Sequence, residues 1–147
     1  MKCRITEGTL EHLDDIALIF DQYRVFYNAA SDISSCKQFL QERFSQKDSK
    51  IFIAVSDTAN ILGFTQLYPT FSSVSMKRVW ILNDLFVRAE VRKSGIGKSL
   101  IEHAIAFAKK DGAVRLSLST AQDNPAQFLY EAIGFKQSGF KFYNYSL

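Results

Sequence analysis

The sequence has little of several features that mark particular classes of protein. Its 147 residues include two cysteines and two prolines, and no apolar stretch approaches the ~18 residues of a membrane span. Cys3 and Cys36 have no metal-ligand spacing, and no His, Cys and carboxylate cluster indicates a metal. We therefore expect two free thiols and no metal site. The first residues lack the apolar run of a signal peptide, which favours a cytoplasmic protein.

The sequence also has little excess of charge of either sign. The formal net charge is +3, and the lysine and arginine residues are scattered rather than gathered in a run. This distribution argues against a nucleic-acid stripe and against a patch for anionic membranes. It is compatible with an anionic small ligand.

The chain does contain enough apolar material for one folded domain. Hydrophobic residues make up 47% of the sequence and charged residues 22%, a balance that disfavours disorder. Neither repeats nor a linker-like segment divides the chain. We predict a single domain over residues 1–147.

Hydrophobic periodicity predicts both strands and helices. Strand-like patterns cover residues 3–6, 50–56, 61–73 (interrupted by Pro69), 77–87, 113–120 and, as a closing pair of strands, 135–147. Helical patterns cover the segment capped by Thr9 up to about 27, a segment opened by a capping box at Ser35 and Gln38 and running to about 46, and residues 95–110 and 126–132. The resulting order predicts an α/β mixed sheet: an antiparallel meander, one βαβ crossover and helices on both faces.

A glycine-rich turn, "VRKSGIGKSL" (91–100), stands directly before the third helix. Backbone N–H groups at a helix N-terminus, close to basic side chains, make an anion site. A nucleotide-binding P-loop needs glycine where Arg92 stands, and the dinucleotide fingerprint needs glycine where Leu100 stands. Both nucleotide readings therefore fail at one residue each.

Two motifs together give the turn a different meaning. The segment "LNDLFVRAEVRKSGIGKSLIEHAIAFAKKDG" (82–112) resembles the acetyl-CoA-binding motif of the GNAT superfamily of N-acetyltransferases, a strand L-x-x-L-x-V followed by R/Q-x-x-G-x-G/A and a helix. Downstream, "NPAQFLYEAIGF" (124–135) is similar to the A-x-x-L-Y-E-x-x-G-F pattern of the same family. The resemblance implies the GNAT acyl-CoA N-acyltransferase fold and an N-acetyltransferase.

The resemblance also implies how acetyl-CoA is held. Its pyrophosphate would lie on the N–H groups of residues 93–98, and its pantetheine arm would run beside the strand end at 85–87. The usual asparagine of the second motif falls on Asp123, and its neighbour Asn124 can serve after a shift of one residue. The implied cofactor-binding residues are Leu85, Phe86, Val87, Arg92, Lys93, Ser94, Gly95, Ile96, Gly97, Lys98, Ser99, Asn124 and Tyr130.

Three residues are candidates for the chemistry. By resemblance, the hydroxyl of Tyr130 points at the thioester sulfur and acts as general acid. Asp84 interrupts an apolar strand, where a carboxylate is costly unless it is used, so it is a candidate base or amine anchor. Asn83 stands where similar diamine acetyltransferases have Glu, and "NDLFV" also resembles a histone/D-amino-acid subgroup. Strict alternation puts Asn83 and Asp84 on opposite faces, so both reach one cleft only if a β-bulge intervenes.

The acceptor side is less specific. We expect a primary amine of a small molecule or peptide, with Tyr27, Asp32, Tyr68 and Asp84 as substrate-binding residues. The aromatic lining with few acids argues against a polycation. A non-catalytic acyl-CoA-binding or sensor module on the same fold is the alternative. The closing segment "FKFYNYSL" can pair with the edge of another subunit, so we expect a homodimer.

Overall fold

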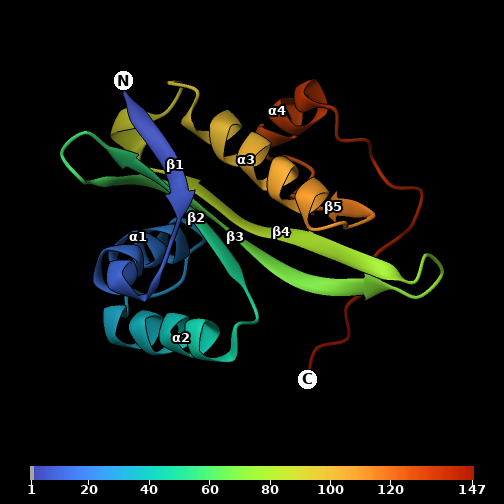
Figure 1. Ribbon diagram of the computed structural model, residues 1–147, viewed down its shortest axis with the longest axis horizontal. Coiled ribbons are helices and arrows are strands. Elements are labelled where there is room, and N and C mark those ends of the chain that lie inside the picture. Colours follow the sequence, from blue (N-terminus) through green and yellow to red (C-terminus); the bar gives the residue numbers. More distant parts are fainter. Residues whose placement is uncertain (1) are drawn as a thin grey trace.

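Five strands form one sheet, with the strands in the same order in space as in the chain (Figure 1). The computed structural model describes residues 2–147. The strands are β1 (Cys3–Glu7), β2 (Lys50–Ser56), β3 (Ile61–Ser72), β4 (Lys77–Val87) and β5 (Arg115–Ser117). The helices are η1 (Leu10–His12), α1 (Leu13–Phe26), α2 (Ile33–Gln46), η2 (Ala89–Val91), α3 (Ile96–Lys110) and α4 (Ala126–Ile133). β1 to β4 pair antiparallel, and α3 crosses over to place β5 parallel to β4, as predicted.

Helices cover both faces of the sheet (Figure 1). Alternate side chains of β2 explain the two cores, because successive residues of a strand point to opposite faces. Ile51 and Ile53 pack with α1 and α2, whereas Phe52 and Ala54 pack with α3. The sheet therefore separates the α1–α2 side of the molecule from the α3–α4 side.

A β-bulge at Asn83 breaks the alternation in β4. Gln66 of β3 pairs with Asp84 and the next residue, Leu67, pairs with Leu82, so Asn83 is the extra residue of the ladder. As a result Leu82 and Leu85 both pack on the α3 side, and Asp84 between them is buried on the α1 side. A regular strand would have sent Leu82 and Asp84 to the same face. The bulge is thus what turns the carboxylate toward α1.

β4 and β5 are paired over only part of their length. The parallel ladder ends at Ile81 and Ser117, while β4 continues to Val87. The chain after β5 leaves the sheet and reaches α4. The carboxyl end of β4 is therefore unpaired on the β5 side, where a ligand with amide groups can lie beside it.

The structure corrects several local predictions. α2 begins at Ile33 and is capped by Asp32, whose Oδ1 accepts a hydrogen bond from the Ser35 N–H at 3.1 Å, so Ser35 is not the cap. β3 runs through Pro69 without interruption, because β2 stops pairing at Leu67 and the missing N–H then falls on an edge portion of the strand.

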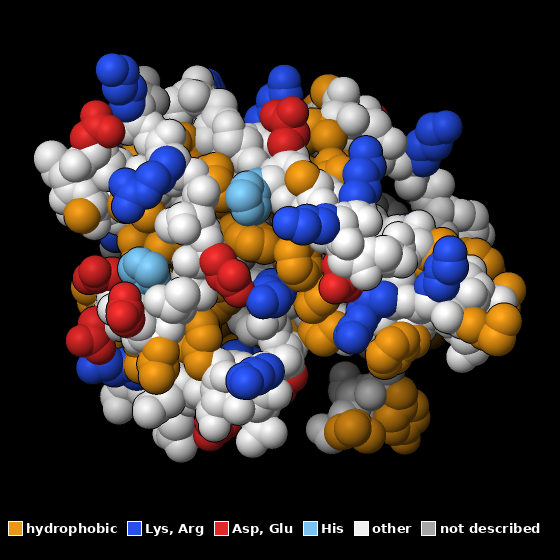
Figure 2. All heavy atoms as spheres, in the orientation of Figure 1, with side chains coloured by type: hydrophobic (Ala, Val, Ile, Leu, Met, Phe, Trp, Pro, Cys, Tyr) orange, Lys and Arg blue, Asp and Glu red, His pale blue; other side chains and the backbone are white. Residues whose placement is uncertain are grey.

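The predicted closing strands are wrong for this structure. Residues 135–147 contain no strand, and residues predicted as strand at 113–120 form one only over Arg115–Ser117. A strand exists by pairing, and an alternating sequence cannot supply its own partner. The side chains of Phe142, Tyr143 and Tyr145 stay 83–90% exposed. Figure 2 shows apolar side chains gathered around the tip of the β3–β4 hairpin and the C-terminal segment below it.

The structure also bears on what the sequence predicts about thiols, membrane helices and metal sites. Cys3 and Cys36 are both free thiols, as predicted. Across residues 2–147, no helix has the length and apolar character needed to cross a bilayer. Within the same residues no group of three or more His, Cys, Asp or Glu side chains is arranged to hold a metal ion.

Candidate active site

A buried carboxylate lies at the centre of the candidate site. Asp84 is 4% exposed, and its two oxygens accept hydrogen bonds from three side chains. Oδ1 accepts from the Tyr23 hydroxyl at 2.7 Å and from Asn83 Nδ2 at 3.0 Å, and Oδ2 accepts from Gln66 Nε2 at 2.7 Å. A carboxylate offers about four acceptor positions, so one position on Oδ2 has no partner from these three donors.

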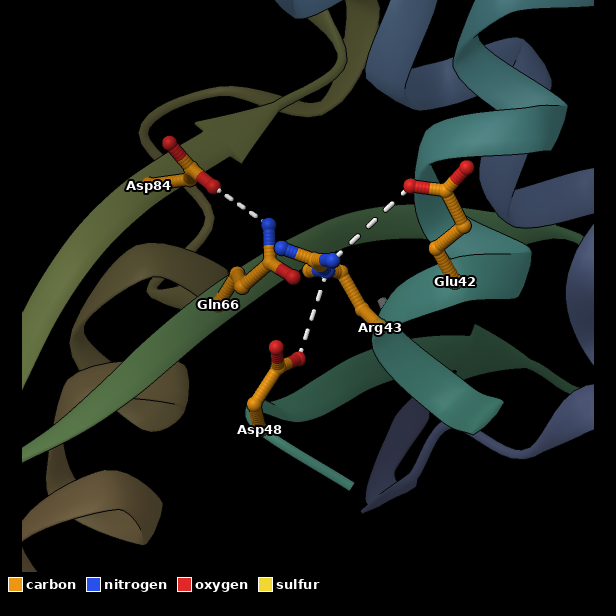
Figure 3. Close-up of polar contacts among 5 residues, drawn as sticks. All are labelled: Glu42, Arg43, Asp48, Gln66 and Asp84. Atoms are coloured by element: carbon orange, nitrogen blue, oxygen red, sulfur yellow. Dashed lines mark hydrogen bonds and ion pairs between the residues drawn. The ribbon is translucent and has the colours of Figure 1, made fainter. Parts of the chain in front are cut away.

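Gln66 lies next to the charged side chains at the end of α2 (Figure 3). Its side chain from β3 lies between Asp84 and Arg43, as Figure 3 shows. Its Oε1 is buried and has no hydrogen-bond partner within residues 2–147. Arg43 Nε lies 3.2 Å from Asp48 Oδ1, so the guanidinium charge is balanced next to this amide.

Two tyrosines close to Asp84 are held in their neutral form. Burial, and then the neighbouring Asp84 carboxylate, raises the pKa of Tyr23 far above its usual range. The same two causes raise the pKa of Tyr68. Both phenols therefore remain protonated, and can donate hydrogen bonds, at neutral pH.

Two cavities meet at the bulge. The first, about 270 Å³, lies between the unpaired end of β4, the segment after β5 and α4, and is lined by Tyr23, Tyr27, Leu82, Asn83, Leu85, Leu118, Ser119, Thr120, Ala121, Asn124 and Tyr130. The second, about 480 Å³, lies on the α1–α2 side and is lined by Phe20, Arg24, Ser35, Cys36, Phe39, Tyr68, Asn83 and Asp84. Asn83 lines both cavities, and Asp84 lines the second. The bulge therefore allows Asn83 and Asp84 to face one cavity, which a regular strand would prevent.

Tyr130 faces the first cavity from α4. Burial, with a smaller contribution from Tyr27, raises the pKa of its hydroxyl, so the group is protonated at neutral pH. Asn124 lines the same cavity, and its Oδ1 accepts a hydrogen bond at 2.9 Å from the N–H of Ala126, the first residue of α4. The two residues expected from the second motif are therefore together on one wall.

The glycine turn presents a row of free backbone donors. The N–H groups of residues 93–98 make no hydrogen bond within the part of the chain that the structure describes. The turn is shaped by left-handed backbone at Lys93 (φ +64°) and Gly95 (φ +87°), and Gly95 is the N-cap of α3. Donors that converge at the positive end of a helix dipole form an anion site.

The Arg92 side chain packs against the end of β4. Its guanidinium lies 5.3 Å from the ring centroids of both Phe26 and Phe86, and its Nε donates to the Val87 carbonyl at 2.9 Å. Lys93 and Lys98 are exposed beside the turn. Lys93, Lys98 and the exposed Arg92 thus carry the positive charge beside the turn, and Arg92 also ties the turn to the end of β4.

The predicted substrate residues fall in different places. Tyr27 lines the first cavity and Tyr68 the second, but Asp32 lines neither, because its carboxylate is engaged in capping α2. The sequence analysis missed Gln66 and Arg24. Gln66 carries a weak signal, a polar residue in the apolar run "FTQLY", whereas nothing local distinguishes Arg24.

Comparisons with known proteins identify the family of the chain. The model of the "Acetyltransferase (GNAT) family" matches residues 16–135. The chain is 47% identical over 130 residues to "Uncharacterized N-acetyltransferase YhfO" of Bacillus subtilis, with 87% of each chain covered. It is 32% identical over 118 residues to a "Probable acetyltransferase" of Haemophilus influenzae, with 80% of each covered.

A solved structure described as "a probable acetyltransferase" has a TM-score of 0.94 and 46% identity, covering 98% of this chain and 97% of that one. Its likeness extends over the whole sheet and both helical layers. The match over residues 16–135, together with these relatives, shows that the chain belongs to the GNAT acetyltransferase family and has the GNAT fold.

Proposed function

We propose that this protein transfers the acetyl group of acetyl-CoA to a primary amine of a small molecule or peptide. The observation that carries the proposal is the row of free N–H groups at residues 93–98, in a turn that Arg92 ties to Val87 at the end of the bulged strand; Tyr130 and the same strand line the first cavity. A phosphate cradle next to an acid and a buried carboxylate is what transfer from a phosphate-bearing thioester needs.

The residues present fit acetyl-CoA. The N–H groups of residues 93–98 would hold the pyrophosphate, with Lys93 and Lys98 adding charge. The unpaired edge of Leu85 to Val87 would hold the amides of the pantetheine arm, and Asn124 lies on the opposite wall. Acetyl-CoA supplies the thioester, whose carbonyl carbon accepts the amine.

The reaction divides between the two sides of the bulge. Tyr130 would give its proton to the sulfur as the carbon–sulfur bond breaks, which avoids release of a free thiolate. The amine must lose a proton to attack, because an alkylamine with a lysine-like pKa of about 10.4 is mostly protonated at pH 7. Asp84 would either accept that proton or bind the charged amine, directly or through a water held by Asn83.

Ligand-dependent thermal stability tests the proposal cheaply. Acetyl-CoA and CoA should raise the melting temperature and ATP should not, because the turn lacks the glycine of a P-loop at Arg92. Release of free CoA, followed with a thiol reagent across a panel of amines, then separates an enzyme from a non-catalytic acyl-CoA-binding module. Stabilisation by ATP alone would overturn the proposal, and stabilisation by acetyl-CoA without CoA release would favour the module.

Two glycine variants test the cradle itself. Gly97→Ala should leave acetyl-CoA binding nearly unchanged, because the motif that this turn resembles has Gly or Ala at this position, and a Cβ there would stand at ordinary contact distances of 3.8 Å from Val87 and 3.9 Å from Leu129. Gly95→Ala should lower both binding and stability, the latter by about 1 kcal/mol, because φ is +87° there. Binding is measured by titration calorimetry and stability by urea unfolding.

Gly112→Ala is the matched control for this series. Gly112 has φ +81° and open space around it, as Gly95 has, but it lies at the other end of α3. It should lose a similar stability and keep normal acetyl-CoA binding. Equal loss of binding in Gly95→Ala and Gly112→Ala would mean that backbone strain, not the cradle, is being measured.

We also propose that the protein is a homodimer. Phe140, Phe142, Tyr143 and Tyr145 are each at least 83% exposed in one chain, an apolar surface that a second copy would cover. Sedimentation of the full chain, compared with a chain ending at residue 138, tests whether this segment holds two copies together.

A further inference from the structure

The second cavity carries one charge of each sign within aromatic walls. Asp84 and Arg24 both line it, together with Phe20, Phe39 and Tyr68. Asp84 is its only lining carboxylate and Arg24 its only lining cation. A cavity of about 480 Å³ with this lining is large enough for an aromatic amine of amino-acid size.

Arg24 has donors to spare. Its Nη1 donates to the Ala30 carbonyl at 3.1 Å and to Cys36 Sγ at 4.0 Å, and within residues 2–147 neither Nε nor Nη2 makes a hydrogen bond, nor does a carboxylate oxygen come within ion-pair distance. A guanidinium has five N–H donors in a fork that matches a carboxylate. Arg24 as a residue is half-buried and lines the cavity.

The nearby carboxylates do not take up these donors. The Asp21 carboxylate accepts from the Ser31 hydroxyl and the Asp32 N–H, each at 2.7 Å, and these bonds lower its pKa together with a smaller contribution from Arg24. Asp32 is engaged by Ser35. Both offset part of the field of Arg24, but neither lines the cavity or accepts one of its N–H groups. Directional bonding by Arg24 thus remains available to a ligand.

Asp84 supplies the negative charge of the second cavity, where Arg24 supplies the positive charge. It keeps one acceptor position on Oδ2, and its neighbour Asn83 lines the cleft that Tyr130 also lines. An amine held at Asp84 is therefore at the junction with the first cavity. A polycation would place further positive charge against Arg24, without a second lining carboxylate to meet it.

We propose that the acceptor is amphoteric: a primary amine and one carboxylate joined by an apolar or aromatic body, as in an aromatic amino acid or a short peptide with an aromatic C-terminal residue. This inference rests on the proposed acetyltransferase function. The amine meets Asp84, the body lies against Phe20 and Phe39, and the carboxylate pairs with Arg24. The acetylated product keeps the carboxylate and loses the positive charge.

Matched acid and amide acceptors test the role of Arg24. CoA release is measured with phenylalanine against phenylalaninamide, and with glycyl-phenylalanine against its C-terminal amide, with spermidine as a polycation. We expect kcat/KM for at least one acid to exceed that of its amide about tenfold or more. In Arg24→Met the acid-to-amide ratio should collapse to about one, and Arg24→Lys should restore part of it. A merely structural role of Arg24 would lower both members of a pair and leave the ratio unchanged.

Lys110→Met is the control for net charge, because Lys110 is exposed at the end of α3 and its loss should not change the ratio. Spermidine as the best acceptor, or amides used as well as acids by the unmodified protein, would overturn the inference while CoA release upholds the acetyltransferase. Failure of acetyl-CoA to stabilise the protein would instead overturn the proposed function itself. The two failures are thus read from different measurements.

Discussion

Replacing Tyr130 with phenylalanine is expected to lower turnover at least tenfold while leaving acetyl-CoA binding nearly intact. The hydroxyl is the only atom removed, and α4 keeps its packing because the ring of Tyr130 stays beside Phe135, with centroids 6.1 Å apart. A positioned general acid typically raises the reaction rate about 10²- to 10⁴-fold, so loss of the proton donor should lower turnover by a clearly measurable factor. Turnover is measured by CoA release and binding by calorimetry.

The raised pKa of Tyr130 adds a second expectation. Because burial keeps the hydroxyl protonated, the unmodified enzyme should show no loss of the acid on the alkaline side up to about the ordinary tyrosine pKa of ~10. Tyr143→Phe is the matched control, since Tyr143 is 83% exposed in the C-terminal segment and lines neither cavity. Unchanged turnover in Tyr130→Phe would remove this residue as the acid.

Asp84→Asn should lower turnover about 100-fold at pH 7, and the loss should shrink as the pH approaches the pKa of the acceptor amine. At low pH the amine is protonated and needs a group to take its proton, whereas at high pH it loses the proton unaided. The effect is therefore largest on the acid side. Turnover of both proteins across pH 6 to 10 (roughly the span below a lysine-like amine pKa) is the measurement.

The same substitution has a structural cost that must be measured separately. The amide NH₂ would face one of the donors that now bond the carboxylate, Tyr23, Asn83 or Gln66, and a lost buried hydrogen bond costs about 1–3 kcal/mol. Tyr23→Phe removes one of those donors and keeps the carboxylate, so it reports that structural cost with Asp84 in place. A deficit of Asp84→Asn that is equal at every pH would assign Asp84 to anchoring the amine and not to accepting its proton.

Local sequence predicted the glycine turn and the elements on either side of it well. The strand at Lys77–Val87 and the helix at Ile96–Lys110 lie as predicted, because apolar spacing and the glycine N-cap are properties of neighbouring residues. The free N–H groups of the turn follow from the same local geometry. The antiparallel meander and the crossover were also predicted, since short connections leave few ways to join such strands.

The surroundings of Asp84 are formed by pairing between distant segments, which local sequence does not specify. The sequence indicated that Asn83 and Asp84 could share a cleft only through a bulge, but the bulge itself is a matter of register between β3 and β4. Gln66 meets Asp84 from another strand, and Tyr23 meets it from a helix 61 residues away in the chain. The closing strands failed for the same reason, because residues 135–147 have the pattern of strands and no paired edge.

The sequence by itself therefore determined the family, the order of the elements from β1 to α4, the glycine turn and the place of Tyr130 on α4, all of which are written in runs of adjacent residues. Only the tertiary structure decided which side of the sheet Asp84 faces, which side chains bond it, and that Arg24 borders the same cavity. The physical reason is that hydrogen bonds and cavities are formed between segments, and a single residue of register decides which side chains face each other.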